Sequence, residues 1–292
     1  MARSPRRDDF AASPRPAVSL RAATLQFGDR VLWEGLDLDV RRGELVAVLG
    51  PNGAGKTSLI RVLLGLQRLT SGEVLINGTP PRRGDHAIGY VPQQKGFDRD
   101  LPLRGTDLVR LGLDGHRWGL VKPTRRARER VAAAIASVGA GDWAHSPLGS
   151  LSGGEQQRLR IAQALLSDPS VLLCDEPLLS LDLGHQQAVM TLIDRLRRER
   201  NSAVILVTHE INPILPLVDR VLYLVGGRWA VGTPEEVMTT ERLTDLYGAP
   251  VDVLRVRDRI VVVGAPDLEH DHLSGGHHHV EDELRGQQRG LL

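Results

Sequence analysis

Eight residues, Gly50 to Thr57, have the spacing of a loop that holds phosphate. They read Gly-Pro-Asn-Gly-Ala-Gly-Lys-Thr and fit the pattern G-x-x-x-x-G-K-[ST] without a gap. The glycines let backbone N–H groups point at phosphate oxygens, Lys56 can reach the β- and γ-phosphates, and the Thr57 hydroxyl can bind Mg²⁺. An apolar run at 45–49 precedes this loop and a helical pattern at 57–66 follows it. The phosphate is therefore expected at a helix N-terminus, where free N–H groups and the helix dipole favour an anion.

Other polar residues follow apolar strand patterns further along the chain. Asp175 and Glu176 come directly after one such run, and His209 comes shortly after another. Because ligands of open parallel sheets bind outside the carboxyl ends of the strands, these residues and Gly50 are expected at one rim. Asp175 can hold Mg²⁺ opposite Thr57, while Glu176 can orient or deprotonate a water that attacks the γ-phosphate. A simple acidic turn and a surface histidine are the plainer interpretations.

A second anion site is predicted where Leu-Ser-Gly-Gly-Glu-Gln-Gln-Arg occupies 151–158. Ser152 and the two glycines after it would cap a helix, and that helix N-terminus would favour an anion. One chain needs only one such site for one nucleotide. Two chains packed head-to-tail would bring each cap to the nucleotide held by the other chain. An ordinary helix cap is the alternative, and the residues by themselves leave both open.

The elements that must position these residues form an α/β pattern. Apolar strand patterns alternate with helical ones, which favours a parallel sheet covered on both faces. Short alternating patterns at 18–25 and 31–40 predict strands before the phosphate loop, and 101–166 is mostly helical in pattern. Two runs at 251–256 and 259–263 predict a hairpin that turns at Arg257 and Asp258.

Composition narrows the class of protein. The chain has 292 residues, of which 41% are hydrophobic and 25% charged, as in ordinary globular proteins. Aromatic residues make up only 3%, too few for a base-stacking platform, and the net charge of +1 gives no strong attraction to nucleic acid or lipid. Cys174 is the single cysteine, and no apolar run approaches the ~18–20 residues that span a bilayer. Met1 to Pro16 lacks the apolar core of a secretory signal and is expected to be a disordered arm.

With these motifs together, the chain resembles the nucleotide-binding subunit of an ABC transporter over about 18–247. The residues at 151–157 are similar to the signature motif of that family. The resemblance implies a P-loop NTPase core with a parallel sheet, an N-terminal antiparallel β subdomain and an inserted α-helical subdomain. It implies ATP and Mg²⁺ as ligands, hydrolysis of ATP, and a head-to-tail homodimer at the cytoplasmic face of a membrane, bound to permease subunits. No nucleic-acid partner is expected.

The resemblance also implies roles for single residues. Phe27 would stack on adenine, Gln93 would sense Mg²⁺ and water, and Glu176 and His209 would act at the γ-phosphate. Ser152, Gly153, Gly154 and Asp182 would meet the nucleotide of the partner chain. The implied nucleotide ligands in the loop are Gly50, Pro51, Asn52, Gly53, Ala54, Gly55, Lys56, Thr57 and Ser58, and the implied Mg²⁺ ligands are Thr57, Gln93 and Asp175. Leu178, Leu179 and Glu210 depart from the family pattern without removing a phosphate or Mg²⁺ ligand.

Two regions point to a substrate. The stretch from Gln93 to Leu103 resembles the zinc and manganese importers of the family, which commonly work with a metal-binding substrate-binding protein. Five of the ten histidines lie near the C-terminus, where imidazole with carboxylate suits Zn²⁺. These candidate zinc ligands are His270, His272, His277, His278 and His279. A solvated, unstructured tail is the alternative. The expected organisation is an arm at 1–17, an ATPase domain at 18–247, and an extension at 248–292 with the hairpin and the histidine-rich tail.

Rival functions within the same family differ in what they require of the sequence. ATPases of DNA repair insert long coiled coils before the signature, yet only about a hundred residues without sustained heptads lie there. Translation factors of the twin-cassette type need a second cassette. An ATPase for siderophore, haem or export transport remains the open alternative to a metal importer.

Overall fold

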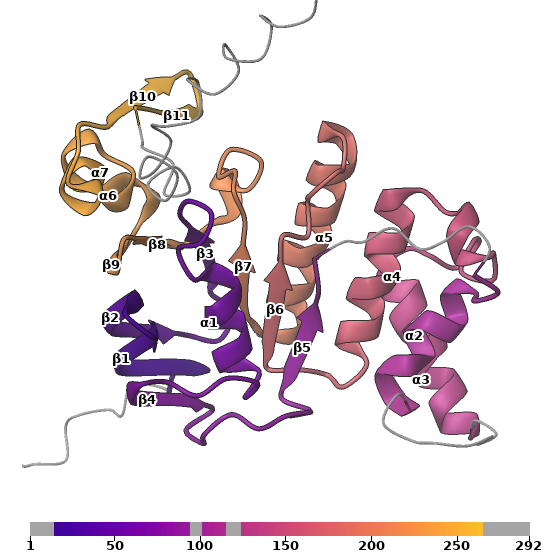
Figure 1. Cartoon of the computed structure of the whole chain (residues 1–292). Helices are drawn as coiled ribbons and strands as arrows, with labels where there is room; N and C mark the ends of the chain where they lie inside the picture. The colour runs from indigo at the N-terminus through magenta and orange to yellow at the C-terminus, as the bar shows by residue number, and fades with distance from the viewer. Residues whose placement is uncertain (1–14, 94–100, 115–123, 265–292) are drawn as a thin grey trace, which may run out of the picture.

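The computed structural model describes residues 15–93, 101–114 and 124–264. Two sheets with helices around them make up most of these residues (Figure 1). The smaller sheet has the strand order β2-β1-β4 and is antiparallel. Its strands are β1 (Val18–Phe27), β2 (Arg30–Val40) and β4 (Ser71–Ile76). The predicted N-terminal antiparallel sheet is therefore confirmed, and β4, which follows the phosphate loop in the chain, also belongs to it.

The larger sheet has six strands in the order β5-β6-β7-β3-β8-β9. The first five are parallel, as predicted, but β9 pairs antiparallel with β8 through a tight turn at Gly226 and Gly227. The sequence predicted a parallel sheet, and the observed sheet is mixed because this last strand is antiparallel. Its strands are β5 (Ile88–Val91), β6 (Val171–Asp175), β7 (Ala203–Val207), β3 (Leu45–Leu49), β8 (Arg220–Val225) and β9 (Arg228–Gly232).

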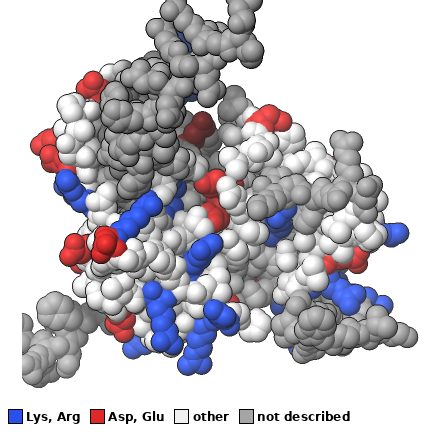
Figure 2. All heavy atoms as spheres, viewed as in Figure 1, with Lys and Arg blue, Asp and Glu red and all other residues white. Residues whose placement is uncertain are grey.

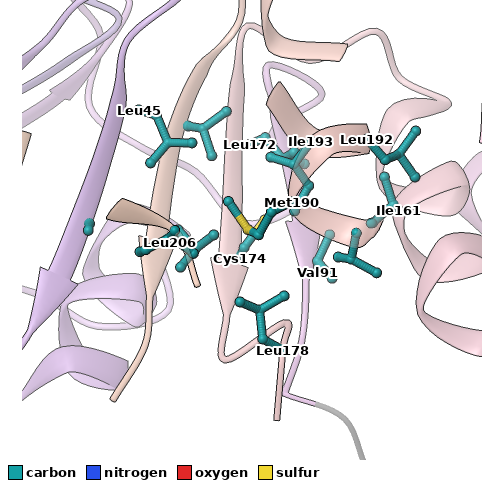
Figure 3. Packing of buried hydrophobic residues seen from close by; sticks show 14 of the residues in the cluster. Leu45, Val91, Ile161, Leu172, Cys174, Leu178, Met190, Leu192, Ile193 and Leu206 are labelled. Carbon is teal, nitrogen blue, oxygen red and sulfur yellow. The ribbon is translucent and has the colours of Figure 1, made fainter. Parts of the chain in front are cut away.

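Alternate residues of the central strands enter two different cores. Leu45, Leu172 and Leu206 face helices on one side, where they pack with Met190 and Ile193 (Figure 3). Residues next to them, such as Val46 and Leu173, face the antiparallel sheet and the helix after the phosphate loop. The sheet is therefore covered on both faces, which explains why its strands are continuously apolar.

The helices divide into those against the sheets and those in a separate group beside them. Helix α1 follows β3, and α5 lies between β6 and β7 in the chain. Helices α2, α3 and α4 contact one another and form the predicted inserted helical group, at the right of Figure 1. Their bounds are α1 (Lys56–Leu63), α2 (Gly105–Asp114), α3 (Arg125–Ser137), α4 (Gly153–Leu165) and α5 (Leu183–Arg200), with short 3₁₀ turns at Leu148–Ser150 and Leu215–Leu217.

The described chain ends in two small helices and a hairpin. Helices α6 (Pro234–Val237) and α7 (Thr240–Tyr247) precede the antiparallel strands β10 (Asp252–Val256) and β11 (Arg259–Val263). The hairpin predicted from the sequence is present. Its outer face leaves Leu254, Val256, Val261 and Val263 exposed.

Within the described ranges, none of the helices has the length and hydropathy that crossing a bilayer requires. On the face shown in Figure 2, basic and acidic side chains occur together over the described residues. Cys174 is wholly buried beside Met190, and burial raises the pKa of its thiol. It is a small packing residue of the core.

Candidate active site

The phosphate loop joins β3 to α1, and its glycines are required by close backbone approaches. At Gly50, where φ is 139°, a Cβ atom would lie 2.0 Å from the carbonyl oxygen of Leu224 in β8. At Gly55, where φ is 94°, a Cβ atom would lie 2.7 Å from the ring of Trp33. Any side chain at either position would displace a neighbouring strand or a fully buried indole. The shape of the loop therefore depends on β8 and β2 as well as on its own residues.

Arg30 also supports this loop. Its guanidinium Nη2 donates to the carbonyl oxygen of Gly53 at 2.9 Å, from the first residue of β2. No sequence motif includes Arg30, which begins β2 and is separated from the loop by the rest of β2 and by β3. Its contact arises only when the two sheets come together.

Lys56 begins α1 and is buried, with 6% of its surface exposed. Its ammonium Nζ donates to the carbonyl oxygens of Gly50 at 2.7 Å and Pro51 at 2.8 Å. Burial lowers the pKa of Lys56, while Glu176 and Asp175 act in the opposite direction. The cation thus lies inside the curve of the loop and in the field of both carboxylates, where a phosphate could replace the loop carbonyls as its partner.

Four neighbouring strands end at the same edge of the large sheet. They are β5, β6, β7 and β3, all parallel, so their carboxyl ends lie together (Figure 1). Gln93 comes two residues after β5, Asp175 ends β6, His209 comes two residues after β7, and Gly50 follows β3. The expectation that Gly50, Asp175 and His209 share one rim is confirmed by this strand order, and Gln93 joins them.

Two of these residues meet at Glu176. Gln93 Nε2 donates to Glu176 Oε2 at 2.8 Å, and His209 Nε2 lies 2.5 Å from Glu176 Oε1. The backbone N–H of Glu176 donates to the carbonyl oxygen of Val207 at 2.9 Å, and its φ is +48°. A positive φ at a residue with a Cβ atom is strained and persists only where the surrounding structure imposes it. The carboxylate is consequently held from both sides in one orientation, beside the phosphate loop.

Asp175 is the most buried acid of the site, with 4% of its surface exposed. Burial raises the pKa of this carboxyl and so does Glu176, whereas Lys56 lowers it. Two adjacent carboxylates with only one cation acting on both form an environment that a further cation would stabilise. The described ranges contain no cluster of three His, Cys, Asp or Glu residues that could hold a metal. A Mg²⁺ ion here would depend on Asp175, Gln93 and the exposed Thr57 together with phosphate oxygens and water, which fits the usual sparse ligation of Mg²⁺ by proteins.

The signature residues lie at the start of α4. Ser152 Oγ accepts from the N–H of Glu155 at 3.3 Å, and the Glu155 carboxylate accepts from the N–H of Ser152 at 2.8 Å, which is a capping box. A Cβ atom at Gly154 would lie 2.4 Å from the ring of His185, which Asp182 binds at the start of α5. The starts of α4 and α5 are therefore in contact.

A cavity of about 970 Å³ opens beside the phosphate loop. It is lined by Gly50 to Asn52, by His209 to Pro213 and by Asp258 to Val262 of the hairpin. The signature residues Ser152 to Gly154 are not among its lining residues. The cavity reaches only the first residues of the phosphate loop, since Gly53 to Thr57 do not line it. Helix α4 packs mainly against α2, α3, α5 and β5, whereas α1 packs mainly against β4 and β6, so the two predicted anion sites begin helices of different groups. Phe27 ends β1 and is 51% exposed, so its ring is available to a ligand.

Some predicted residues lie outside the described part of the chain. They are the candidate zinc ligands His270, His272, His277, His278 and His279, residues 1–14 of the predicted arm at 1–17, and most of the stretch between Gln93 and Leu103.

Comparison with known proteins gives consistent matches. The family described as "ABC transporter" matches residues 33–179. The manganese transport system ATP-binding protein MntB of Bacillus subtilis is 35% identical over 248 residues, which are 85% of this chain and 98% of MntB. The zinc transport system ATP-binding protein TroB of Treponema pallidum is 34% identical over 236 residues, which are 80% of this chain and 88% of TroB.

Solved structures agree with these matches. The structure of cbiO1 from Clostridium perfringens, part of the ABC transporter complex cbiONQ, has a TM-score of 0.66 and 26% identity, and covers 79% of this chain and 94% of its own. A nucleotide-free ATP-binding cassette from an ABC transporter has a TM-score of 0.68 at 17% identity, and covers 80% of this chain and 96% of its own. The second likeness concerns the fold alone.

Proposed function

This chain belongs to the ABC transporter family as an ATP-binding subunit that hydrolyses ATP within a complex with membrane subunits, and from that premise we propose how its residues do so. The observation that carries the proposal is the convergence of Gln93 and His209 on the Glu176 carboxylate beside Lys56. ATP binds with its phosphates in the loop Gly50 to Ser58 and its adenine against Phe27. Lys56 then leaves the loop carbonyls and pairs with the β- and γ-phosphates.

Glu176 orients the attacking water and accepts its proton. The water oxygen forms a bond to the γ-phosphorus, and the bond from that phosphorus to the bridging oxygen of ADP breaks, so that ADP and phosphate leave. Gln93 and His209 hold the Glu176 carboxylate in place, and the His209 imidazole also faces the γ-phosphate. Thr57, Asp175 and Gln93 would hold Mg²⁺, whose charge would offset that of the phosphate oxygens.

The working unit is a head-to-tail homodimer. In one chain the signature residues Ser152 to Gly154 begin α4, which packs mainly against α2, α3, α5 and β5, while the phosphate loop leads into α1, which packs mainly against β4 and β6. A second chain can supply them, together with Asp182, whose neighbour His185 contacts Gly154. In this arrangement the dimer lies at the cytoplasmic face of the membrane against its permease subunits.

The transported substrate is a divalent metal, Mn²⁺ or Zn²⁺, delivered by a metal-binding protein. The support is the similarity to two relatives that are named for manganese and zinc transport. The test is uptake of radioactive Mn²⁺ and Zn²⁺ by cells that lack the chromosomal copy and carry this chain, with Glu176→Gln as the inactive control. ATP-dependent uptake of either ion supports the proposal. Normal uptake of both ions without the chain, or with Glu176→Gln, contradicts it.

The histidine-rich tail is proposed to bind Zn²⁺ with modest affinity. Neutral imidazole is the ligand, so binding should weaken as the pH falls through ~6.5. Calorimetric titration with Zn²⁺ compares the full chain with one that lacks residues 268–292. Equal stoichiometry in both proteins would show that the tail takes no part in metal binding. Basal ATP hydrolysis should be nearly the same in the two, because the nucleotide site lies elsewhere in the chain.

A further inference from the structure

One side chain connects the loop that carries His209 to the C-terminal hairpin. Asn212 Nδ2 donates to the carbonyl oxygen of Ile260 at 2.9 Å, and the N–H of Ile260 donates to Asn212 Oδ1 at 2.8 Å. Both polar atoms of the amide are thus used on one backbone residue of β11. Two simultaneous bonds fix the Asn212 side chain far more firmly than one bond would, because they set its orientation as well as its distance.

The His209 loop is held at its other end by the central sheet. The N–H of Thr208 donates to the carbonyl oxygen of Val48 in β3 at 3.2 Å, and the Thr208 hydroxyl bonds to the backbone of Glu210. Only His209, Glu210 and Ile211 lie between Thr208 and Asn212. The backbone that carries the imidazole therefore spans two anchors, one on the sheet and one on the hairpin.

The hairpin is itself well fixed. Ile260 is 4% exposed and belongs to the core on the α5 side of the sheet. On the other strand, the N–H of Val253 donates to Thr240 Oγ1 of α7 at 2.9 Å. The hairpin and the His209 loop also line the same cavity beside Gly50. The strand that Asn212 binds, β11, is thus held to the core through Ile260, while the bond to Thr240 fixes the other strand, β10.

We propose that Asn212 is a positioning residue for ATP hydrolysis, which holds His209 at the Glu176 carboxylate by tying its loop to the hairpin β10–β11. This inference rests on the proposed role of His209. Its consequence is that the C-terminal hairpin, outside the residues matched by the family, takes part in turnover. A shift of β11 would reach the active site through one side chain.

The test compares substitutions in the full chain by steady-state ATP hydrolysis and thermal melting. Asn212→Ala removes both bonds and should lower kcat roughly 10- to 100-fold, with KM for ATP within about twofold, since small displacements of a catalytic group have effects of this size. Asn212→Asp keeps only the acceptor for the Ile260 N–H and should give an intermediate kcat. Thr240→Val is the matched control, because it removes one bond of β10 and leaves both the burial of Ile260 in β11 and its two bonds to Asn212.

The outcomes separate this inference from the function it rests on. The inference is supported if Asn212→Ala lowers kcat while Thr240→Val, with a similar change in melting temperature, does not. It is overturned if kcat follows the melting temperature in all variants, or if Asn212→Ala hydrolyses ATP normally while His209→Ala does not. If His209→Ala itself keeps normal turnover, the proposed role of His209 is wrong. Should Asn212→Ala melt below the assay temperature, the comparison of Asn212→Asp with Thr240→Val decides by the same criteria.

Discussion

Glu176→Gln tests the centre of the proposed mechanism, because it removes a charge and leaves the shape. The carbonyl oxygen of the new glutamine can accept from Gln93 Nε2 in place of Glu176 Oε2, which now lies 2.8 Å away. Its amide group can donate to His209 Nε2 when the imidazole carries its proton on Nδ1. Both contacts can therefore persist, and the free energy of unfolding should change by less than about 0.5 kcal/mol.

Turnover should nevertheless fall by two to four orders of magnitude. A positioned general base contributes roughly 10²- to 10⁴-fold to a rate. At about 1.4 kcal/mol for each factor of ten, this corresponds to ~2.8–5.6 kcal/mol of transition-state stabilisation. ATP binding should be retained, since the substitution removes a negative charge close to the phosphates and no donor to them. The ATP-bound dimer should accumulate as a result.

The assay is phosphate release at saturating ATP, together with nucleotide titration and sizing chromatography with and without ATP. Glu199→Gln is the matched control, because it makes the same change in an exposed ion pair on α5, where Glu199 lies 3.8 Å from Arg195. The control should behave as the wild type. Turnover of Glu176→Gln above about a tenth of the wild-type value would refute the assignment of Glu176 as the group that activates water.

Three further predictions concern binding, assembly and stability. Lys56→Ala removes the buried cation of the phosphate loop and should weaken ATP binding about tenfold or more and abolish hydrolysis; unchanged affinity in a nucleotide titration would contradict the loop assignment. Ser152→Arg should prevent the ATP-dependent dimer in a Glu176→Gln background, because it adds bulk and charge where the nucleotide of the partner should lie. Ser152→Ala loses the hydroxyl and its helix cap, at about 1 kcal/mol, but adds neither, and should still dimerise; a dimer with both variants on a sizing column would argue against head-to-tail packing. Arg197→Ala leaves Asp194 and Asp219 without their shared guanidinium. It should lower the free energy of unfolding, measured by urea denaturation, by roughly 3 kcal/mol. A loss below about 0.5 kcal/mol would mean that these ion pairs contribute little to stability.

Local spacing in the sequence was sufficient for the phosphate loop, the strand before it and the helix after it. It also indicated that Asp175 and His209 follow strands, and that a hairpin lies at 251–263. These features depend on neighbours within a few residues, where backbone geometry and side-chain periodicity act directly. The helix boundaries were less accurate, and α1 ends at Leu63 and not at Leu66.

The tertiary structure alone decided how distant residues meet. Gln93 and Glu176 are 83 residues apart, and Asn212 and Ile260 are 48 apart. Their contacts depend on strand order, which places β5 beside β6 and brings the hairpin to the His209 loop. The support of the loop by Arg30 and Trp33, and the antiparallel pairing of β9, are of the same kind. A short motif indicates what one segment can bind. Which other segments it contacts is determined by the packing of whole sheets and helices, and the free energy of that packing is spread over residues that belong to no motif.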